Sequence, residues 1–247
     1  MGSLLPLRDV FKFIEGVFGS GMHAKRVNSM GTAVYGLMFS SRLCSSGVGR
    51  SLALATGKSP KHCIKQMDRL FGNENFNVTD AFTQFVPLVV GPRKEIVVSL
   101  DWTEYGLMKQ SRIAVNLITS HGRATPLIWK TYNDSAIKNH RGKYERKVLE
   151  ALREKVGEGT HVTVLADRGF ADTSFFEFIQ GHLGWDYCIR FVRSMWVTTS
   201  DGERRKAHEW VPQNGQIKEL DNAVLTDKQK YVVPKMLFLK QRGMKEA

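Results

Sequence analysis

The feature that most constrains the fold is the order of secondary-structure elements predicted between residues 94 and 192. Alternating apolar and β-branched residues predict three strands, followed by a helix, a strand, a helix and a fifth strand. The predicted strands cover 95–103, 111–119, 123–132, 161–167 and 186–192, and the predicted helices cover 143–156 and 174–180. The first three strands can pair as an antiparallel meander. This order predicts a mixed sheet with flanking helices, in the α/β (α+β) class.

Turn and edge signals support this order. His121-Gly122 lies between the second and third predicted strands and is typical of a hairpin-like turn. Pro126 has no backbone N–H to donate to a neighbouring strand, so it predicts that the third strand lies at the sheet edge.

Two of the predicted strands carry an aspartate at or near their C-terminal end. Asp101 lies in the stretch SLDWTEYG, and Asp167 lies in the stretch VLADRGF. The predicted order of elements matches the ribonuclease H-like arrangement, in which the first and fourth strands are neighbours at the centre of the sheet. We therefore expect Asp101 and Asp167 to be close in space, although they are far apart along the chain.

Two neighbouring carboxylates repel each other unless a cation neutralises them, and oxygen ligands without Cys or His suit Mg²⁺ or Mn²⁺. Two such ions can activate a water and stabilise the leaving oxygen of a phosphodiester. An aspartate after an apolar strand can equally be a helix N-cap or a turn former, and either aspartate taken alone fits that interpretation. Both together, in these two positions, favour a metal site.

Residues 1–80 are predicted to form a separate, all-α region. Apolar residues at helical spacing predict helices at 10–18, 27–38, 48–55 and 60–71. Ser59 is the predicted N-cap of the last helix and Pro60 its first residue, and Gly72 is the predicted C-terminal cap.

The last of these helices has a basic face. Lys61, Lys65 and Arg69 recur every four residues, and His62 lies beside them. A helix, a glycine turn and a basic helix over 47–72 have the outline of a helix-turn-helix, which would make 1–80 a DNA-binding region. A solvated charged face on a small helical bundle fits the same residues equally well.

The charge of the chain is consistent with a polyanionic partner. Lys plus Arg number 36 and Asp plus Glu number 24, so the formal net charge is +12, which favours nucleic acid over an uncharged partner. A basic but otherwise ordinary enzyme remains the alternative. The three cysteines match no zinc or redox spacing, and no apolar run is long enough to span a membrane. We therefore expect a reduced, cytoplasmic setting.

The two acidic stretches resemble the first two acidic motifs of bacterial insertion-sequence transposases of the Asp-Asp-Glu (DDE) type, in the insertion-sequence-four group. The stretch PKHCIKQMDRLFGN, residues 60–73, is also similar to part of their N-terminal helical region. The resemblance implies a ribonuclease H-like catalytic domain over 94–247, in which Asp101 and Asp167 are the first and second catalytic acids and bind two Mg²⁺ or Mn²⁺ ions.

The resemblance also implies an activity and partners. Such enzymes hydrolyse a phosphodiester at the transposon end, and the freed 3′-hydroxyl then attacks target DNA. The expected partners are terminal inverted repeats, target DNA and a second copy of the chain in a synaptic complex, in the cytoplasm at the bacterial nucleoid.

The third acid of the family is not found. It is a glutamate in a Tyr-x₂-Arg-x₃-Glu-x₆-Lys pattern, often beyond a β-rich insertion. Glu203, Glu209 and Glu219 lie inside the insertion predicted at 194–230, with a turn at Asp201-Gly202, and Glu246 has neither the Tyr nor the Arg before it. We therefore expect that the domain is incomplete at its C-terminus and that this chain alone is inactive.

Several alternatives remain open. The chain could be a non-catalytic regulator that binds transposon ends, or another ribonuclease H-like nuclease such as a junction resolvase. Arg168 could contact a phosphate or pair with an acid. Thr103 should share the strand face of Asp101, and Glu104 should point to the other face. The cluster 204–206 could contact the DNA backbone or be an exposed charged loop.

Overall fold

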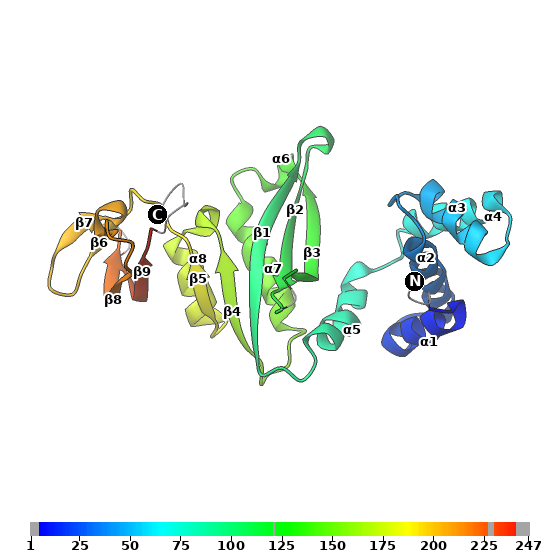
Figure 1. Ribbon diagram of the computed structural model, residues 1–247, viewed down its shortest axis with the longest axis horizontal. Helices are drawn as coiled ribbons and strands as arrows, with labels where there is room; N and C mark the ends of the chain where they lie inside the picture. The colour runs from blue at the N-terminus through cyan, green and yellow to red at the C-terminus, as the bar shows by residue number, and fades with distance from the viewer. Residues whose placement is uncertain (1–4, 121, 227–229, 241–247) are drawn as a thin grey trace. The chain divides into compact units, whose positions relative to one another are not determined.

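The computed structural model describes residues 5–120, 122–226 and 230–240, and Figure 1 shows its ribbon diagram. The predicted turn residue His121 and the excluded acid Glu246 lie outside the described residues. The chain divides into two compact units, Met1–Pro92 and Arg93–Ala247. The helical unit thus continues beyond the expected limit at residue 80, because it contains a further helix, α5 (Val78–Val90).

The predicted helices of the first unit are present, with ends that differ by a few residues from the prediction. They are α1 (Leu7–Phe18), α2 (Ala24–Met38), α3 (Ser45–Thr56) and α4 (Pro60–Phe71). Their apolar stripes form two clusters of buried side chains. Val10, Ile14 and Phe18 of α1 pack with Val27 of α2, and Phe85 of α5 lies against them. The second cluster lies between α2, α3 and α4.

Helices α3 and α4 pack closely, and a glycine permits the contact. A Cβ atom added at Gly49 would lie 2.6 Å from the Cα atom of Ile64, a distance that backbone atoms cannot tolerate. Gly57 ends α3 in the left-handed region, with φ 69°, which favours glycine because it has no Cβ. Pro60 opens α4 as predicted, but the Ser59 side chain makes no capping hydrogen bond, and the residue at the end of the helix, Gly72, is not left-handed.

Replacing Gly49 by alanine is expected to lower the free energy of unfolding by roughly 1–3 kcal/mol, because the new methyl group forces α3 and α4 apart. Gly16→Ala is the matched control, since it lies in the interior of α1 and an added Cβ would meet nothing within 4 Å. The control should stabilise the chain by about 0.5–1 kcal/mol. Urea unfolding followed by circular dichroism measures both changes, and equal effects would contradict the close α3–α4 contact.

The described residues of the second unit form a five-stranded sheet in the order β3-β2-β1-β4-β5. The strands are β1 (Glu95–Tyr105), β2 (Gln110–Leu117), β3 (Thr125–Asn133), β4 (His161–Ala166) and β5 (Asp186–Ile189). β1 pairs antiparallel with β2 and parallel with β4, so the expected meander and the adjacency of the first and fourth strands are confirmed. Pro126 lies on the edge strand β3, as predicted.

The helices of this unit flank the sheet (Figure 1). They are α6 (Asp134–Ile137), α7 (Arg141–Arg153) and α8 (Thr173–Glu177), and α8 continues as a short π-helix, Phe178–His182. The predicted helix 174–180 is therefore irregular, and the predicted strand 186–192 ends early, at Ile189.

The two faces of the five-stranded sheet differ in burial. Ile96, Val98 and Leu100 of β1 are at most 4% exposed, and Trp102 continues this face and is bonded to α7. On the opposite face, Val97 of β1 is 39% exposed and Trp129 of β3 is 40% exposed. One face is thus covered by α7, and the other retains exposed apolar area among the described residues.

A second sheet follows, in the order β7-β6-β8-β9. Its strands are β6 (Trp196–Thr198), β7 (Arg204–Lys206), β8 (Lys218–Leu225) and β9 (Tyr231–Phe238). The β-rich region therefore extends beyond residue 230, the limit predicted for the insertion at 194–230, because β9 pairs with β8. Phe176 of α8 is buried in the core of this sheet. None of the described helices has the length and apolar character that crossing a membrane requires.

Candidate metal and nucleic-acid sites

Asp101 and Asp167 follow the last paired residues of two adjacent parallel strands. Leu100 of β1 is paired with Ala166 of β4; Asp101 is the next residue of β1, and Asp167 directly follows the end of β4 in extended backbone. Because side chains alternate along a strand, both aspartates lie on the face opposite to Leu100, which is the face that α7 leaves open. Both are exposed. The strand register thus places the two predicted acids at adjacent positions at the centre of the sheet.

Asp167 also has a local structural role. Its Oδ1 accepts a hydrogen bond of 2.8 Å from the backbone N–H of Gly169, and this bond caps the 3-10 turn Arg168–Phe170. The turn places Phe170 in the interior, 4% exposed. The interpretation of Asp167 as a turn former therefore holds for one of its carboxylate oxygens. Arg168 is exposed on the same turn.

The residues around Asp101 follow the predicted alternation. Thr103 lies on the same face of β1 as Asp101, with Arg112 of β2 as its cross-strand partner. Glu104 lies on the other face, where it forms an ion pair with Arg141 of α7. Glu104 is therefore not available to a cation held by Asp101.

The donor set at Asp101 and Asp167 suits a hard divalent cation but is incomplete. Carboxylate oxygens are the ligands that Mg²⁺ and Mn²⁺ prefer, and both aspartates can reach the open face. No group of three or more His, Cys, Asp or Glu side chains that could hold a metal occurs within residues 5–120, 122–226 and 230–240. The two acids therefore fit as two ligands of such an ion.

The glutamates that sequence analysis placed in the insertion have other partners. Glu203 pairs with Arg205 on β7, and Glu219 pairs with Lys235 at 3.0 Å across β8 and β9. Glu209 accepts a 2.8 Å hydrogen bond from the backbone N–H of Lys206. Each of the three acids thus has a partner within or beside the second sheet.

A buried acid that sequence analysis missed lies on the covered side of the sheet. Glu145 of α7 is 7% exposed, and its Oε1 accepts a 2.9 Å hydrogen bond from Nε1 of Trp102. Burial raises the pKa of Glu145, and the bond from Trp102 and the charge of Arg146 oppose that shift. Helical spacing could have revealed this residue, because positions 145, 148, 149 and 152 form one stripe.

Replacing Glu145 by glutamine is expected to stabilise the chain near neutral pH. The pKa of Glu145 is higher in the folded than in the unfolded chain, so the free energy of unfolding falls as pH rises from the ordinary glutamate range through the folded pKa. Glutamine keeps the acceptor for Trp102 and has no charge to desolvate. The stability difference between the variant and the parent should therefore be small in acid and grow toward neutral pH. Urea unfolding at several pH values measures it, and exposed Glu150→Gln on the same helix should show no such growth.

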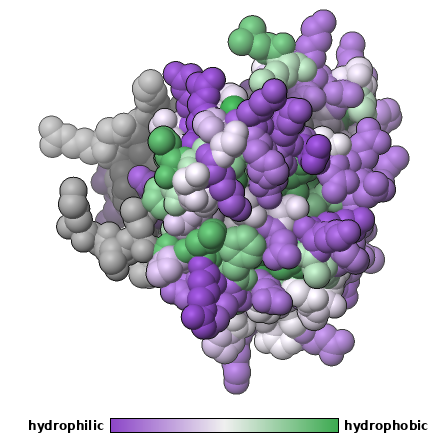
Figure 2. All heavy atoms as spheres, turned by 90° about the vertical axis from the view of Figure 1, so that its right-hand side faces the viewer, coloured by the Kyte–Doolittle hydropathy of each residue, from purple (hydrophilic) through white to green (hydrophobic). Residues whose placement is uncertain are grey.

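The candidate DNA-binding residues share the outer side of α4. Lys61, His62, Lys65 and Arg69 are all exposed, whereas Cys63 and Met67 on the other side are fully buried against α3. The predicted division of this helix into an apolar and a basic face is therefore confirmed. Figure 2 shows one face of the molecule, on which hydrophilic side chains predominate and hydrophobic ones lie between them.

The basic residues 204–206 form strand β7. They do not form the exposed charged loop that was one of the two alternatives for this cluster. Arg204 lies over the ring of Trp196 at 4.4 Å, and Lys206 lies over the same ring at 5.7 Å. Arg205 points to the opposite face and lies 5.1 Å from the ring of Trp210. The alternation of β7 thus distributes the three cations over two tryptophans. The contacts with Trp196 join two strands, β6 and β7, so no local sequence pattern predicts them.

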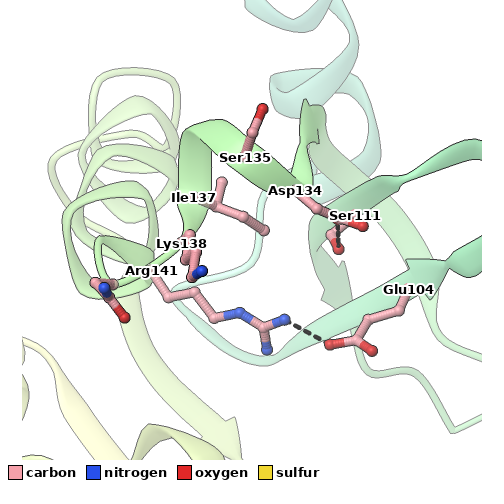
Figure 3. Close-up of a pocket in the computed structure, with 8 residues that line it drawn as sticks. Glu104, Ser111, Asp134, Ser135, Ile137, Lys138 and Arg141 are labelled. Atoms are coloured by element: carbon pink, nitrogen blue, oxygen red, sulfur yellow. Dashed lines mark hydrogen bonds and ion pairs between the residues drawn. The ribbon is translucent and has the colours of Figure 1, made fainter.

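A pocket of about 700 Å³ opens on the covered side, at the end of the sheet where β1 and β2 meet (Figure 3). Its lining combines charged and hydroxyl side chains from β1, β2, α6 and α7. Ser111 is 1% exposed and donates a 2.6 Å hydrogen bond to Asp134, and Arg141 pairs with Glu104 across the pocket. The remaining charged groups of the lining are Asp134 and Lys138, so the pocket holds as many acids as cations.

No protein-family model matches this chain, and no curated protein matches it either.

Proposed function

We propose that the chain is a DNA transposase of a bacterial insertion sequence, of the DDE type, with a ribonuclease H-like catalytic domain. The observation that carries the proposal is the position of Asp101 and Asp167 after the paired ends of β1 and β4, two parallel strands at the centre of the sheet. The strand order β3-β2-β1-β4-β5 is the order expected for a ribonuclease H-like sheet. The net charge of +12 favours a nucleic-acid substrate.

In this proposal Asp101 and Asp167 would hold Mg²⁺ or Mn²⁺ on the open face of the sheet. Bound divalent ions supply activation of a water and charge stabilisation at the reacting phosphodiester. Asp167 positions its carboxylate through the bond to Gly169, which fixes one oxygen and orients the other. Arg168, exposed on the same turn, would contact a DNA phosphate.

The first unit would bind the transposon ends. Helix α4 presents Lys61, His62, Lys65 and Arg69 on one side, and the length of about 18 Å for a twelve-residue helix suits the major groove. Phosphate contacts from these residues would position the chain on inverted repeats. A second copy of the chain would join it in a synaptic complex.

Two alternative functions have specific support. A chain that binds transposon ends without cleaving them would use the exposed basic side of α4, with Lys61, Lys65 and Arg69. The same two acids on a ribonuclease H-like sheet would also suit a junction resolvase. We propose that residues 1–247 alone are inactive in cleavage, since none of the glutamates considered, Glu203, Glu209, Glu219 and Glu246, fits the third acidic motif that the resemblance implies.

A gel-shift titration with Mg²⁺ or Mn²⁺ tests these alternatives against one another. The chain should bind duplexes that carry terminal inverted repeats more tightly than unrelated duplexes, without cleaving them. Cleavage of branched DNA in preference to inverted repeats would support the resolvase. Robust cleavage of transposon ends would show that the chain is a complete enzyme, and absence of binding to any DNA would contradict the whole proposal.

A further inference from the structure

The hairpin of β1 and β2 extends well beyond β4, and β3 accompanies it as far as Asn133, opposite Gln110. The last β4 residue paired with β1 is Ala166, opposite Leu100, whereas β1 and β2 stay paired as far as Tyr105 and Gln110. Four residues of β1 follow Asp101, which corresponds to about 13 Å at roughly 3.3 Å per residue. Figure 1 shows this hairpin projecting past α6.

The tip of the hairpin is apolar and uncovered. The 3-10 turn Gly106–Met108 joins the strands, and Lys109 follows it in the left-handed region with φ 49°. Leu107 is fully exposed and Met108 is 71% exposed, so two large apolar side chains stand next to each other at the end of a projection. Adjacent exposed apolar residues of this kind mark a contact surface.

The surroundings of the tip are basic, which identifies the partner as a polyanion. Glu104 is paired with Arg141, and Asp134 accepts a hydrogen bond from Ser111, so the two acids near the tip are already engaged. The exposed or half-buried cations on the hairpin and beside it are Lys109, Arg112, Lys130 and Lys138. The Nε atom of Arg112 is buried and has no hydrogen-bond partner among the described residues.

We propose that Leu107 and Met108 form a wedge that inserts between stacked bases of DNA, while the surrounding cations hold the flanking phosphates. Leucine and methionine are among the side chains that proteins insert between base steps, where they unstack the bases and kink the duplex. The tip projects from the same end of β1 that carries Asp101. The opened step would therefore lie roughly 13 Å or more beyond the proposed catalytic site along β1. This inference therefore rests on the proposed function.

Duplex DNA that contains 2-aminopurine tests the wedge, because the fluorescence of this base rises when it is unstacked. The full chain at saturating concentration should raise the fluorescence, more strongly for a duplex with a central mismatch, since unstacking is easier there. The double variant Leu107→Ala/Met108→Ala should bind the same DNA with an unchanged salt dependence but lose most of the rise. Ile217→Ala, at another exposed apolar residue of the same unit, should behave as the parent chain.

The outcomes separate the wedge from the proposed function. Binding of the parent chain without any fluorescence rise, or an equal rise with the double variant, would overturn the wedge and leave the transposase proposal intact. Loss of self-association in the double variant, seen by sedimentation with fluorescence unchanged, would assign the tip to a protein contact and also overturn it. Failure to bind any duplex would overturn both proposals.

Discussion

Replacement of Lys61, Lys65 and Arg69 together by alanine is expected to weaken binding to double-stranded DNA by on the order of a hundredfold at about 0.1 M salt. All three side chains are exposed on one side of α4, and the buried Cys63 and Met67 hold the other side of the helix against α3. The substitutions therefore remove charge without disturbing the core. Each phosphate contact releases counterions, so the slope of log affinity against log salt should fall by roughly 2.7 for three lost contacts.

The control for this prediction removes the same charge from other helices of the unit. Arg8 and Lys12 on α1 and Lys25 on α2 are exposed, and their triple alanine variant has the same net charge as the α4 variant. Fluorescence anisotropy at several salt concentrations measures both variants. Equal losses would show that only overall charge matters, and α4 would then be the solvated face of a helical bundle.

The faces of α4 were predictable from sequence because both signals are local. Pro60 fixes the first turn, and the four-residue recurrence of Lys61, Lys65 and Arg69 places them on one side of any helix. Helix α5 was not predicted. Pro87 stands inside it, and proline normally ends or kinks a helix. The packing of the unit overrides that preference, since Phe82, Val86 and Val90 of α5 are all buried.

The central sheet was predictable for a similar reason, and the second sheet was not. The order of the elements was enough to place Asp101 and Asp167 on neighbouring strands. The alternation of side chains along β1 was enough to place Asp101 and Glu104 on opposite faces of the sheet. In the second sheet β6 and β7 have only three residues each, too few for a periodic signal. The contacts of Trp196 with Arg204 and Lys206 depend on the pairing of β6 with β7, which no local pattern contains.

The charges around Glu145 are misleading about its burial, although its helical spacing with Val148, Leu149 and Leu152 indicates the buried face. Glu145 lies in the stretch KYERK, which is typical of a solvated helix face, yet it occupies the apolar stripe of α7. Its partner Trp102 comes from β1, so the reason for its burial is visible only when the helix is placed on the sheet. Trp102 itself is half-buried and lies beneath the guanidinium of Arg141.

Replacement of Asp101 by asparagine is expected to weaken the binding of Mn²⁺ to the chain by about tenfold or more, because a hard divalent ion loses one of two carboxylate ligands. Calorimetry or the electron paramagnetic resonance of Mn²⁺ measures the affinity. Glu104→Gln is the matched control, since Glu104 lies three residues further on the same strand but on the opposite face. An equal loss in the control, or no loss in Asp101→Asn, would remove the basis for a metal site here.

Asp167 allows its two roles to be separated. Asp167→Asn keeps an acceptor for the N–H of Gly169, so it should weaken Mn²⁺ binding as Asp101→Asn does while leaving stability nearly unchanged. Asp167→Ala removes the cap as well and should also lower the free energy of unfolding by about 1 kcal/mol. If Asp167→Asn leaves the ion affinity intact and only Asp167→Ala has an effect, on stability, then Asp167 is a turn residue alone. The strand adjacency with Asp101 would then serve folding and not catalysis.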